Sequence, residues 1–267
     1  MLCASEASFR YSARGDAARS ERFALQNVSV TMERGRITGL LGPNGGGKTT
    51  LLKLLSGINA PERGRVTLDG VDLASMARRR VAQRIAVVPQ ETHPAFDYTV
   101  MEMVLMGRHP HLSTFQLEGP DDLRIAHDAL QATGTDHLSA RAFATLSGGE
   151  KQRVIIASAL AQASDVLLLD EPTASLDLGY QLDVAALLQR LNRERQVTMA
   201  IATHDLNLAA SLCDTLILVR EGQVLAAGRT DEVLTAPMIR RLYGVDADVR
   251  LHERAGHLTV VPVGRAR

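Results

Sequence analysis

The chain has 267 residues, enough for one large domain or two small ones with a substantial buried core. Apolar residues make up 45% and charged residues 22%, as in ordinary globular proteins. The 30 Lys and Arg residues balance 30 Asp and Glu residues, so no net field recruits nucleic acid or anionic lipid. Aromatic residues contribute only 3%, which disfavours base-stacking platforms and interfacial aromatic belts.

The two cysteines and the N-terminus both indicate a protein of a reducing compartment. Cys3 and Cys213 lie far apart and fit no disulfide or metal-ligand spacing. The first ten residues lack the basic end and apolar run of a secretory signal. The longest apolar runs, such as residues 166–169, are too short to span a bilayer. If the protein works at a membrane, we therefore expect a partner to supply the spanning helices.

Short apolar runs alternate with longer helical patterns along the chain, which predicts a largely parallel β-sheet with crossover helices. The runs are nearly continuous, as in sheets that are covered on both faces. The predicted strands are residues 37–41, 85–88, 166–169 and 198–202. Between the last two, apolar residues recur at three- and four-residue steps from Leu178 to Leu191, which predicts an amphipathic helix.

Three other regions differ from this alternation. Two short strand-like runs, residues 28–32 and 66–68, predict an antiparallel β region in the first seventy residues. Residues 99–144 contain no strand-like run and predict a helical insertion. Thr99 and Glu102 have the spacing of a capping box at its start, and a further helix starts after the break at 119–122. Residues 258–263 predict a small strand near the C-terminus.

A glycine-rich segment follows the strand predicted at 37–41 and precedes a helical pattern at 50–56. It fits the phosphate-binding pattern G-x-x-x-x-G-K-[ST] at every position: Gly42, Pro43, Asn44, Gly45, Gly46, Gly47, Lys48 and Thr49. Glycines let the backbone turn with positive φ and bring its N–H groups against phosphate oxygens. The N-terminus of the next helix adds the positive end of its dipole.

Two side chains of this P-loop have predicted roles. Lys48 is expected to reach the β- and γ-phosphates of a nucleotide, and the Thr49 hydroxyl is expected to bind Mg²⁺. The competing interpretation is a glycine-rich strand–helix turn without a ligand. The Lys-Thr pair at the one required spacing argues against that interpretation.

A second motif, Leu146-Ser147-Gly148-Gly149-Glu150, predicts the start of a helix. Ser147 and Glu150 have the spacing of a capping box, which by itself accounts for both residues. Capping does not account for two adjacent glycines in the first turn, where they cost stability. We interpret Gly148 and Gly149 as room for another backbone or a phosphate to approach closely.

In this order after a P-loop, the motif resembles the hallmark of the ABC (ATP-binding cassette) ATPase family, and the similarity runs roughly from Phe9 to Val245. The resemblance implies an α/β fold with a RecA-like P-loop NTPase core, an antiparallel β subdomain and a helical insertion. We expect one ABC ATPase domain over residues 1–267. Residues 1–90 and 160–245 would form the nucleotide-binding core with the β subdomain, 91–159 the helical subdomain and 246–267 a C-terminal extension.

The resemblance also implies a homodimer with two ATP molecules between its subunits. In such a dimer the Ser147-Gly148-Gly149 motif of one chain covers the γ-phosphate that the P-loop of the other chain holds. The sequence has one copy of each motif, so the second copy must come from another chain. The segment Ser175-Leu176-Asp177 matches the loop that crosses the dimer interface in the family.

Four further residues match the family pattern in the expected order. The run at 166–171 ends in two carboxylates, which a strand delivers to the sheet edge where ligands of α/β folds bind. By resemblance, Asp170 supports Mg²⁺ and Glu171 polarises the attacking water. Gln90 matches the glutamine that contacts Mg²⁺ and senses the transport partner, and His204 matches the switch histidine at the γ-phosphate. Two adjacent acidic residues often mark only the start of a helix, and a single histidine is often structural. The presence of the other motifs in the expected order favours the functional interpretation of both.

The rest of the nucleotide site follows from the same resemblance. The family stacks an aromatic ring on adenine from an early strand; we choose Tyr11, with Phe9 as the alternative because residues 12–22 form a longer segment than usual. The residues expected to bind the nucleotide are Tyr11, Gly42, Pro43, Asn44, Gly45, Gly46, Gly47, Lys48, Thr49, Thr50, Ser147, Gly148 and Gly149.

The segment at 106–111 resembles ATPase subunits of importers for iron–siderophore complexes, haem and cobalamin. The residues at 203–210 and 242–245 fit the same group, and zinc and manganese importers have a similar stretch. His109 and His111 can also be interpreted as metal ligands; without a third or fourth ligand nearby, we favour solvated histidines.

The sequence thus predicts an ATPase subunit of an ABC importer, which hydrolyses ATP to ADP and phosphate with Mg²⁺ at the cytoplasmic face of the inner membrane. Expected partners are a second copy, two polytopic permease subunits and an extracytoplasmic substrate-binding protein, and no nucleic acid. The alternatives are a zinc or manganese importer ATPase, a soluble ABC protein outside transport, and another P-loop enzyme such as a small-molecule kinase. The motif at 146–150 argues against a kinase, whose site is completed within one chain.

Overall fold

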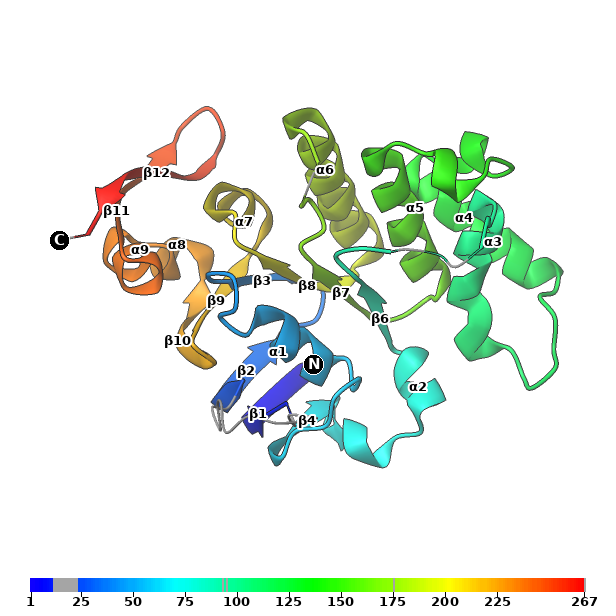
Figure 1. The fold of residues 1–267 in the computed structure, drawn as a ribbon, viewed down its shortest axis with the longest axis horizontal. Helices are drawn as coiled ribbons and strands as arrows, with labels where there is room; N and C mark the ends of the chain where they lie inside the picture. The colour runs from blue at the N-terminus through cyan, green and yellow to red at the C-terminus, as the bar shows by residue number, and fades with distance from the viewer. Residues whose placement is uncertain (12–23, 93, 95, 175, 267) are drawn as a thin grey trace, which may run out of the picture. The chain divides into compact units, whose positions relative to one another are not determined.

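The computed structural model describes residues 1–11, 24–92, 94, 96–174 and 176–266 (Figure 1). The chain divides into two compact units, Met1–Met76 with Thr198–Arg267, and Ala77–Val197. Among the described residues, no helix combines the length and the apolar character that crossing a membrane requires.

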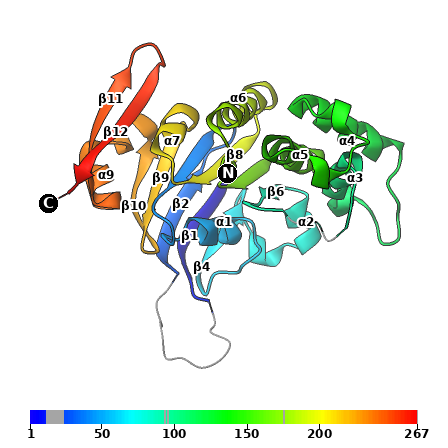
Figure 2. The same ribbon diagram turned by 45° about the horizontal axis from the view of Figure 1, so that its top comes forward.

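An antiparallel sheet opens the first unit, with strand order β2-β1-β4-β5 (Figure 2). Its strands are β1 (Leu2–Phe9), β2 (Leu25–Met32), β4 (Arg63–Leu68) and β5 (Val71–Asp72). The predicted antiparallel β region is therefore confirmed, with longer strands than expected. Sequence analysis missed β1, in which polar and small residues interrupt the apolar alternation.

The second group of strands in the first unit has the order β10-β9-β3-β8, in which β9, β3 and β8 are parallel and β10 pairs antiparallel to β9. These are β3 (Ile37–Leu41), β8 (Thr198–Thr203), β9 (Thr215–Arg220) and β10 (Gln223–Arg229). β3 pairs in parallel with both β8 and β9, and all of its residues are buried, as its apolar run predicted. Helix α1 (Lys48–Leu55) contacts β8 and β1, so its buried leucines pack against strands of both sheets.

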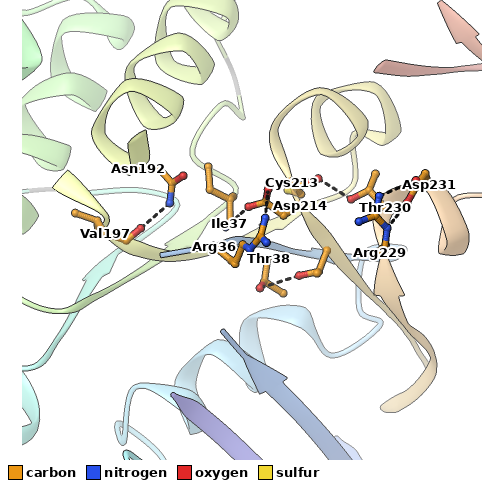
Figure 3. A network of polar contacts seen from close by, with 11 residues as sticks. Arg36, Ile37, Thr38, Asn192, Val197, Cys213, Asp214, Arg229, Thr230 and Asp231 are labelled. Atoms are coloured by element: carbon orange, nitrogen blue, oxygen red, sulfur yellow. Dashed lines mark hydrogen bonds and ion pairs between the residues drawn. The ribbon is translucent and has the colours of Figure 1, made fainter. Parts of the chain in front are cut away.

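Asp214, just before β9, fixes the N-terminal end of β3 (Figure 3). The backbone N–H of Ile37 donates to Asp214 Oδ2 at 2.9 Å, Arg36 Nη1 lies 3.3 Å from Oδ1, and the Asp214 N–H donates to the Ile37 carbonyl at 2.8 Å. The Asp214 carbonyl accepts the N–H of Thr230 at 3.1 Å. These bonds connect the N-terminal ends of β3 and β9, which pair in parallel from there.

The first unit continues through α7 (Leu206–Leu212), α8 (Thr230–Val233) and α9 (Ala236–Tyr243) to a C-terminal hairpin. The hairpin consists of β11 (Val245–His252) and β12 (His257–Arg265), which confirms the small strand predicted at 258–263. β11 contacts α9 and β12 contacts α7 (Figure 1).

The second unit combines two parallel strands with a group of helices. β6 (Ile85–Val88) pairs with β7 (Val166–Asp170). The α-helices are α2 (Arg78–Ala82), α3 (Val100–Leu105), α4 (Pro120–Thr133), α5 (Gly148–Ala161) and α6 (Leu178–Arg195). The 3₁₀-helices are η2 (Met106–His111), η3 (Asp136–Leu138) and η4 (Phe143–Thr145). Capping boxes at Thr99 and Ser147 start α3 and α5, as predicted.

Residues 106–111 pack α3, α4 and α5 together (Figure 1). Gly107 lies so close to α5 that a Cβ atom there would be 2.1 Å from the Ser158 carbonyl oxygen. The buried Arg108 donates from Nε to Asp122 Oδ1 at 2.9 Å and from Nη1 to the Ala161 carbonyl at 2.7 Å. This segment therefore has a packing role within the second unit.

His111 differs from its predicted state. A ring nitrogen of this half-buried side chain, Nε2, lies 2.8 Å from the Gln162 carbonyl oxygen, so the expectation of a solvated histidine is wrong here. His109 is exposed, as expected. No local pattern around His111 indicates that Gln162, at the C-terminal end of α5, lies beside this ring.

The Arg108–Asp122 ion pair leads to a prediction about stability. The hydrogen bond from Arg108, together with one from the Gly119 N–H, lowers the pKa of the Asp122 carboxyl. A lowered folded-state pKa adds stability above the unfolded pKa of about 3.9, and this contribution is lost as pH falls through the folded pKa. Asp122→Asn should therefore lower the free energy of unfolding by about 3 kcal/mol at neutral pH, because Arg108 stays buried without its counter-charge.

Urea titrations at about pH 7 and about pH 3.5 measure the difference in free energy of unfolding between the wild type and Asp122→Asn. This difference should be smaller at the lower pH. Asp128→Asn is the matched control on the same helix, because Asp128 pairs with Arg124 at the surface. It should cost at most about 0.5 kcal/mol. Equal losses in the two variants would contradict the role given to the buried pair.

Candidate nucleotide-binding and catalytic site

The P-loop joins β3 to α1 and packs tightly against the end of β9 and the turn between β9 and β10. A Cβ atom on Gly42 would lie 2.0 Å from the carbonyl oxygen of Val219, so no larger residue fits there. The Gly46 N–H donates to the Pro43 carbonyl at 3.0 Å, and the Gly46 carbonyl accepts the Gly222 N–H at 2.9 Å. These contacts fold the loop onto itself and hold it against the first unit.

Gly47 occupies the N-cap of α1 with a φ of 111°, a conformation that other residues rarely adopt. Because glycine has no side chain, no side-chain oxygen from the N-cap competes for the backbone N–H groups at the start of α1. The positive end of the helix dipole therefore meets the loop, and the geometry fits an anion such as a phosphate.

Lys48 is the first residue of α1 and only 5% exposed. Its Nζ donates to the Gly42 carbonyl at 2.8 Å and to the Pro43 carbonyl at 3.3 Å, so the ammonium lies across its own loop. A buried ammonium group is costly unless hydrogen bonds or an opposite charge compensate it. The loop places this cation where it can meet a polyphosphate, while Asn44 and Thr49 are exposed.

Tyr11 is placed beside the first turn of α1. Its hydroxyl lies 3.3 Å from Thr50 Oγ1, and the residue is 56% exposed. Phe9 is half-buried and meets the Tyr11 ring edge to face, with 4.9 Å between the ring centroids. Of the two aromatic candidates, Tyr11 therefore presents the more accessible ring next to the P-loop helix.

Parallel strand register brings His204 to the edge where the P-loop begins. Leu41 lies opposite Thr203 in the β3–β8 pair, so Gly42 and His204 both follow at the C-terminal ends of adjacent strands. His204 is exposed. The next residue, Asp205, is the N-cap of α7 and accepts the N–H groups of Asn207 and Leu208 at 2.9 and 3.0 Å.

In the second unit, parallel strand register likewise brings the predicted acidic and amide residues to one edge of the sheet. Val88 lies opposite Leu169 in the β6–β7 pair, so Gln90 and the carboxylates of Asp170 and Glu171 leave the strands at one edge. Asp170 is 8% exposed, and Gln90 is exposed. Glu171 has a φ of 49°, a left-handed conformation that is uncommon for residues other than glycine and that clusters at functional sites.

The start of α5 has the predicted capping geometry. The Ser147 N–H and hydroxyl each donate to Glu150 Oε2 at 2.8 Å, and these bonds lower the pKa of the Glu150 carboxyl. Ser147 and Gly148 are exposed at the helix N-terminus. Ser175, predicted for the interface loop, lies outside the described residues.

Gly149 has a structural explanation that sequence analysis missed. A Cβ atom at this position would lie 2.4 Å from Cδ1 of Tyr180, whose ring, from α6, packs onto the start of α5. A Cβ atom on Gly148 would meet its nearest neighbour, Leu176 Cδ2, at an ordinary 3.5 Å. The two glycines therefore differ: Gly149 makes room for a ring of its own chain, and Gly148 stays open to the surface. Nothing near Tyr180 in the sequence signals this contact.

Residues 25–174 match the family model described as ABC transporter. The chain belongs to the ABC transporter family. It is 42% identical over 240 residues to the ferric enterobactin transport ATP-binding protein FepC of Escherichia coli K12, covering 90% of this chain and 89% of the relative. It is 43% identical over 252 residues to the hemin import ATP-binding protein HmuV of Gloeobacter violaceus, covering 92% of this chain and 90% of that relative.

A solved structure described as a metal-chelate type ABC transporter in an inward-facing conformation has the same fold. Its chain superposes with a TM-score of 0.84 at 30% identity, over 98% of this chain and 96% of that one. The predicted ABC ATPase fold is confirmed, and so is the resemblance to the import ATPases. The protein is an ATPase of this family, as predicted.

The Gly149–Tyr180 contact predicts a specific pattern of stabilities. Gly149→Ala should lower the free energy of unfolding by about 1–3 kcal/mol, because the methyl group collides with the Tyr180 ring. Adding Tyr180→Ala should remove this penalty, so that the two substitutions are strongly non-additive. Urea unfolding of the four proteins in the double-mutant cycle measures the coupling.

Gly148→Ala is the matched control, one residue away in the same helical turn. It should leave stability unchanged or raise it by up to about 1 kcal/mol, because alanine favours the helix. Additive losses in the Gly149→Ala and Tyr180→Ala pair would show that the ring does not dictate the glycine.

Proposed function

We propose that this protein is the ATP-hydrolysing subunit of an ABC importer that powers uptake of an iron chelate, haem or cobalamin through a separate permease. The observation that carries the ATPase part is the P-loop, with its buried Lys48 and glycine N-cap at the start of α1. Family membership and the relatives named for ferric enterobactin and hemin support the importer part.

The residues of the first unit would bind the nucleotide. The backbone N–H groups of the loop from Gly42 to Thr50 and the Lys48 ammonium would hold the phosphates. The exposed Tyr11 ring would stack on adenine. His204 would contact the γ-phosphate from the neighbouring strand end.

The residues of the second unit would provide the metal ligands and the base. Carboxylate, amide and hydroxyl oxygens suit Mg²⁺, and we assign Asp170, Gln90 and the Thr49 hydroxyl of the first unit to it. When bound, Mg²⁺ neutralises charge on the phosphate oxygens. Glu171 would orient the attacking water and accept its proton.

A composite site explains why the chain has one copy of each motif. We propose a homodimer in which Ser147, Gly148 and Gly149 of one chain complete the site at the P-loop of the other. The exposed Ser147 at the N-terminus of the 14-residue helix α5 supports this assignment, because a helix N-terminus favours a phosphate.

We further propose a peripheral position at the cytoplasmic face of the inner membrane, bound to two polytopic permease subunits that work with an extracytoplasmic substrate-binding protein. Within one ABC ATPase domain, residues 1–90 and 160–245 would form the core, 91–159 the helical subdomain and 246–267 an extension. Zinc or manganese import is the nearest alternative. Gly107 and Arg108 have packing roles, so they give no support to either cargo.

Replacement of the base tests the proposed chemistry. Glu171→Gln should keep ATP binding and lower the rate of ATP hydrolysis about 10²- to 10⁴-fold, because the amide keeps the shape of the side chain but does not accept a proton. Phosphate release measures the rate, and isothermal titration measures binding. Size-exclusion chromatography should show an ATP-bound dimer. A variant that hydrolyses ATP at the wild-type rate would remove Glu171 from the mechanism.

Mixing two inactive variants tests the composite site. Lys48→Ala should weaken ATP binding, and Ser147→Arg should block dimer closure while its own P-loop still binds ATP. A heterodimer of the two contains one site with both defects and one with neither, so the mixture should recover hydrolysis that each variant lacks. Differently tagged chains establish that the heterodimer forms. A purified heterodimer without activity would count against independent composite sites, and full activity of Ser147→Arg alone would refute them.

A further inference from the structure

The side chain of Asn207 bonds the C-terminal hairpin to α7. Asn207 Nδ2 donates to the Val260 carbonyl at 3.2 Å, and the Val260 N–H donates to Asn207 Oδ1 at 2.8 Å. Val260 itself is 2% exposed. One amide therefore satisfies both backbone groups of a buried residue.

This pairing imitates a neighbouring strand. Val260 lies opposite Val249 in the β11–β12 ladder, and its N–H and carbonyl point to the outer edge of β12. The Asn207 amide supplies there the donor and the acceptor that a backbone would supply. Pro262, two residues further along β12, has no N–H to offer. The bond is thus a specific attachment at a defined point of the strand.

The attachment lies next to the predicted switch residue. His204 directly follows the last residue of β8, and Asp205 is the N-cap of α7. Asn207 is the second residue of that helix. The Tyr243 hydroxyl, from the end of α9, donates to the His204 carbonyl at 3.5 Å. Three hydrogen bonds with the C-terminal part of the chain therefore hold the segment from His204 to Asn207.

We propose that Asn207 is a positioning residue for ATP hydrolysis: through Val260, the C-terminal hairpin holds the first turn of α7 and so fixes the place of His204. The inference rests on the proposed function, because it assigns His204 to the γ-phosphate. Nucleotide affinity comes mainly from the P-loop, whereas the rate of hydrolysis depends on groups placed at the reacting phosphate. Loosening the attachment therefore affects the rate and leaves ATP binding intact.

Three variants of the full-length chain test the proposal. Asn207→Ala removes both bonds to Val260. Asn207→Asp keeps an acceptor for the Val260 N–H but places a carboxylate against the Val260 carbonyl. Arg250→Ala is the matched control, because Arg250 pairs with Asp248 on the solvent-exposed surface of the same hairpin.

The readouts are kcat and KM for ATP hydrolysis, the Kd for ATP, and hydrogen exchange of the peptide that covers residues 204–212. We expect kcat to fall about tenfold in Asn207→Ala and less in Asn207→Asp, while KM and Kd stay within about twofold. Exchange in the first turn of α7 should become faster, and Arg250→Ala should match the wild type in every readout.

Wild-type kcat and exchange in Asn207→Ala would overturn the proposal. A parallel loss of ATP binding, kcat and Tm would also overturn it, because that pattern marks a general structural role. If Asn207→Ala does not fold, Asn207→Asp provides the same split between kcat and Kd. A wild-type chain that fails to hydrolyse ATP would refute the proposed function instead, and exchange would then decide separately whether Asn207 holds α7.

Discussion

The close approach of the P-loop backbone to the end of β9 and to the β9–β10 turn constrains the part of the candidate nucleotide site that lies in the first unit. With the Val219 carbonyl 2.0 Å from where a Gly42 Cβ would lie, and the Gly46 carbonyl bonded to the Gly222 N–H at 2.9 Å, the loop has little freedom to open. Its fixed path determines where α1 begins and where Lys48 lies. A binding loop that is ordered before its ligand arrives loses less conformational entropy on binding. The glycines thus serve the packing of the loop as much as the approach of a phosphate.

The register of the parallel strands determines which predicted site residues lie at the same edge of the sheet. The parallel β3–β8 pair places Gly42 and His204 at one edge, and the parallel β6–β7 pair does the same for Gln90 and the two carboxylates. In the first unit, the bonds of Asp214 to Ile37 and to Arg36 fix β3 and β9 at the opposite end (Figure 3). Within each unit, the predicted site residues are therefore aligned by backbone hydrogen bonds several residues away.

The helical insertion shows how a sequence resemblance can have a packing origin. Residues 106–111 resemble those of iron-chelate importers, yet Gly107 lies against α5 and Arg108 is buried with Asp122. A buried ion pair is costly to break from one side, so a chain with this helical arrangement has a physical reason to keep both partners. In this chain the segment therefore has a packing explanation, and it gives no information about cargo.

The sequence alone determined the features whose partners are close along the chain. The P-loop, the capping boxes at Thr99 and Ser147, and the strands at 37–41 and 85–88 were predicted correctly, because spacing over a few residues specifies their hydrogen bonds or periodicity. The roles of the predicted site residues remain predictions. Only the tertiary structure revealed the ring of Tyr180 over Gly149, the bond of His111 to Gln162, and the attachment of Asn207 to Val260. These partners lie 31, 51 and 53 residues apart along the chain, respectively. Their contact depends on how whole helices and strands pack, which no local pattern encodes.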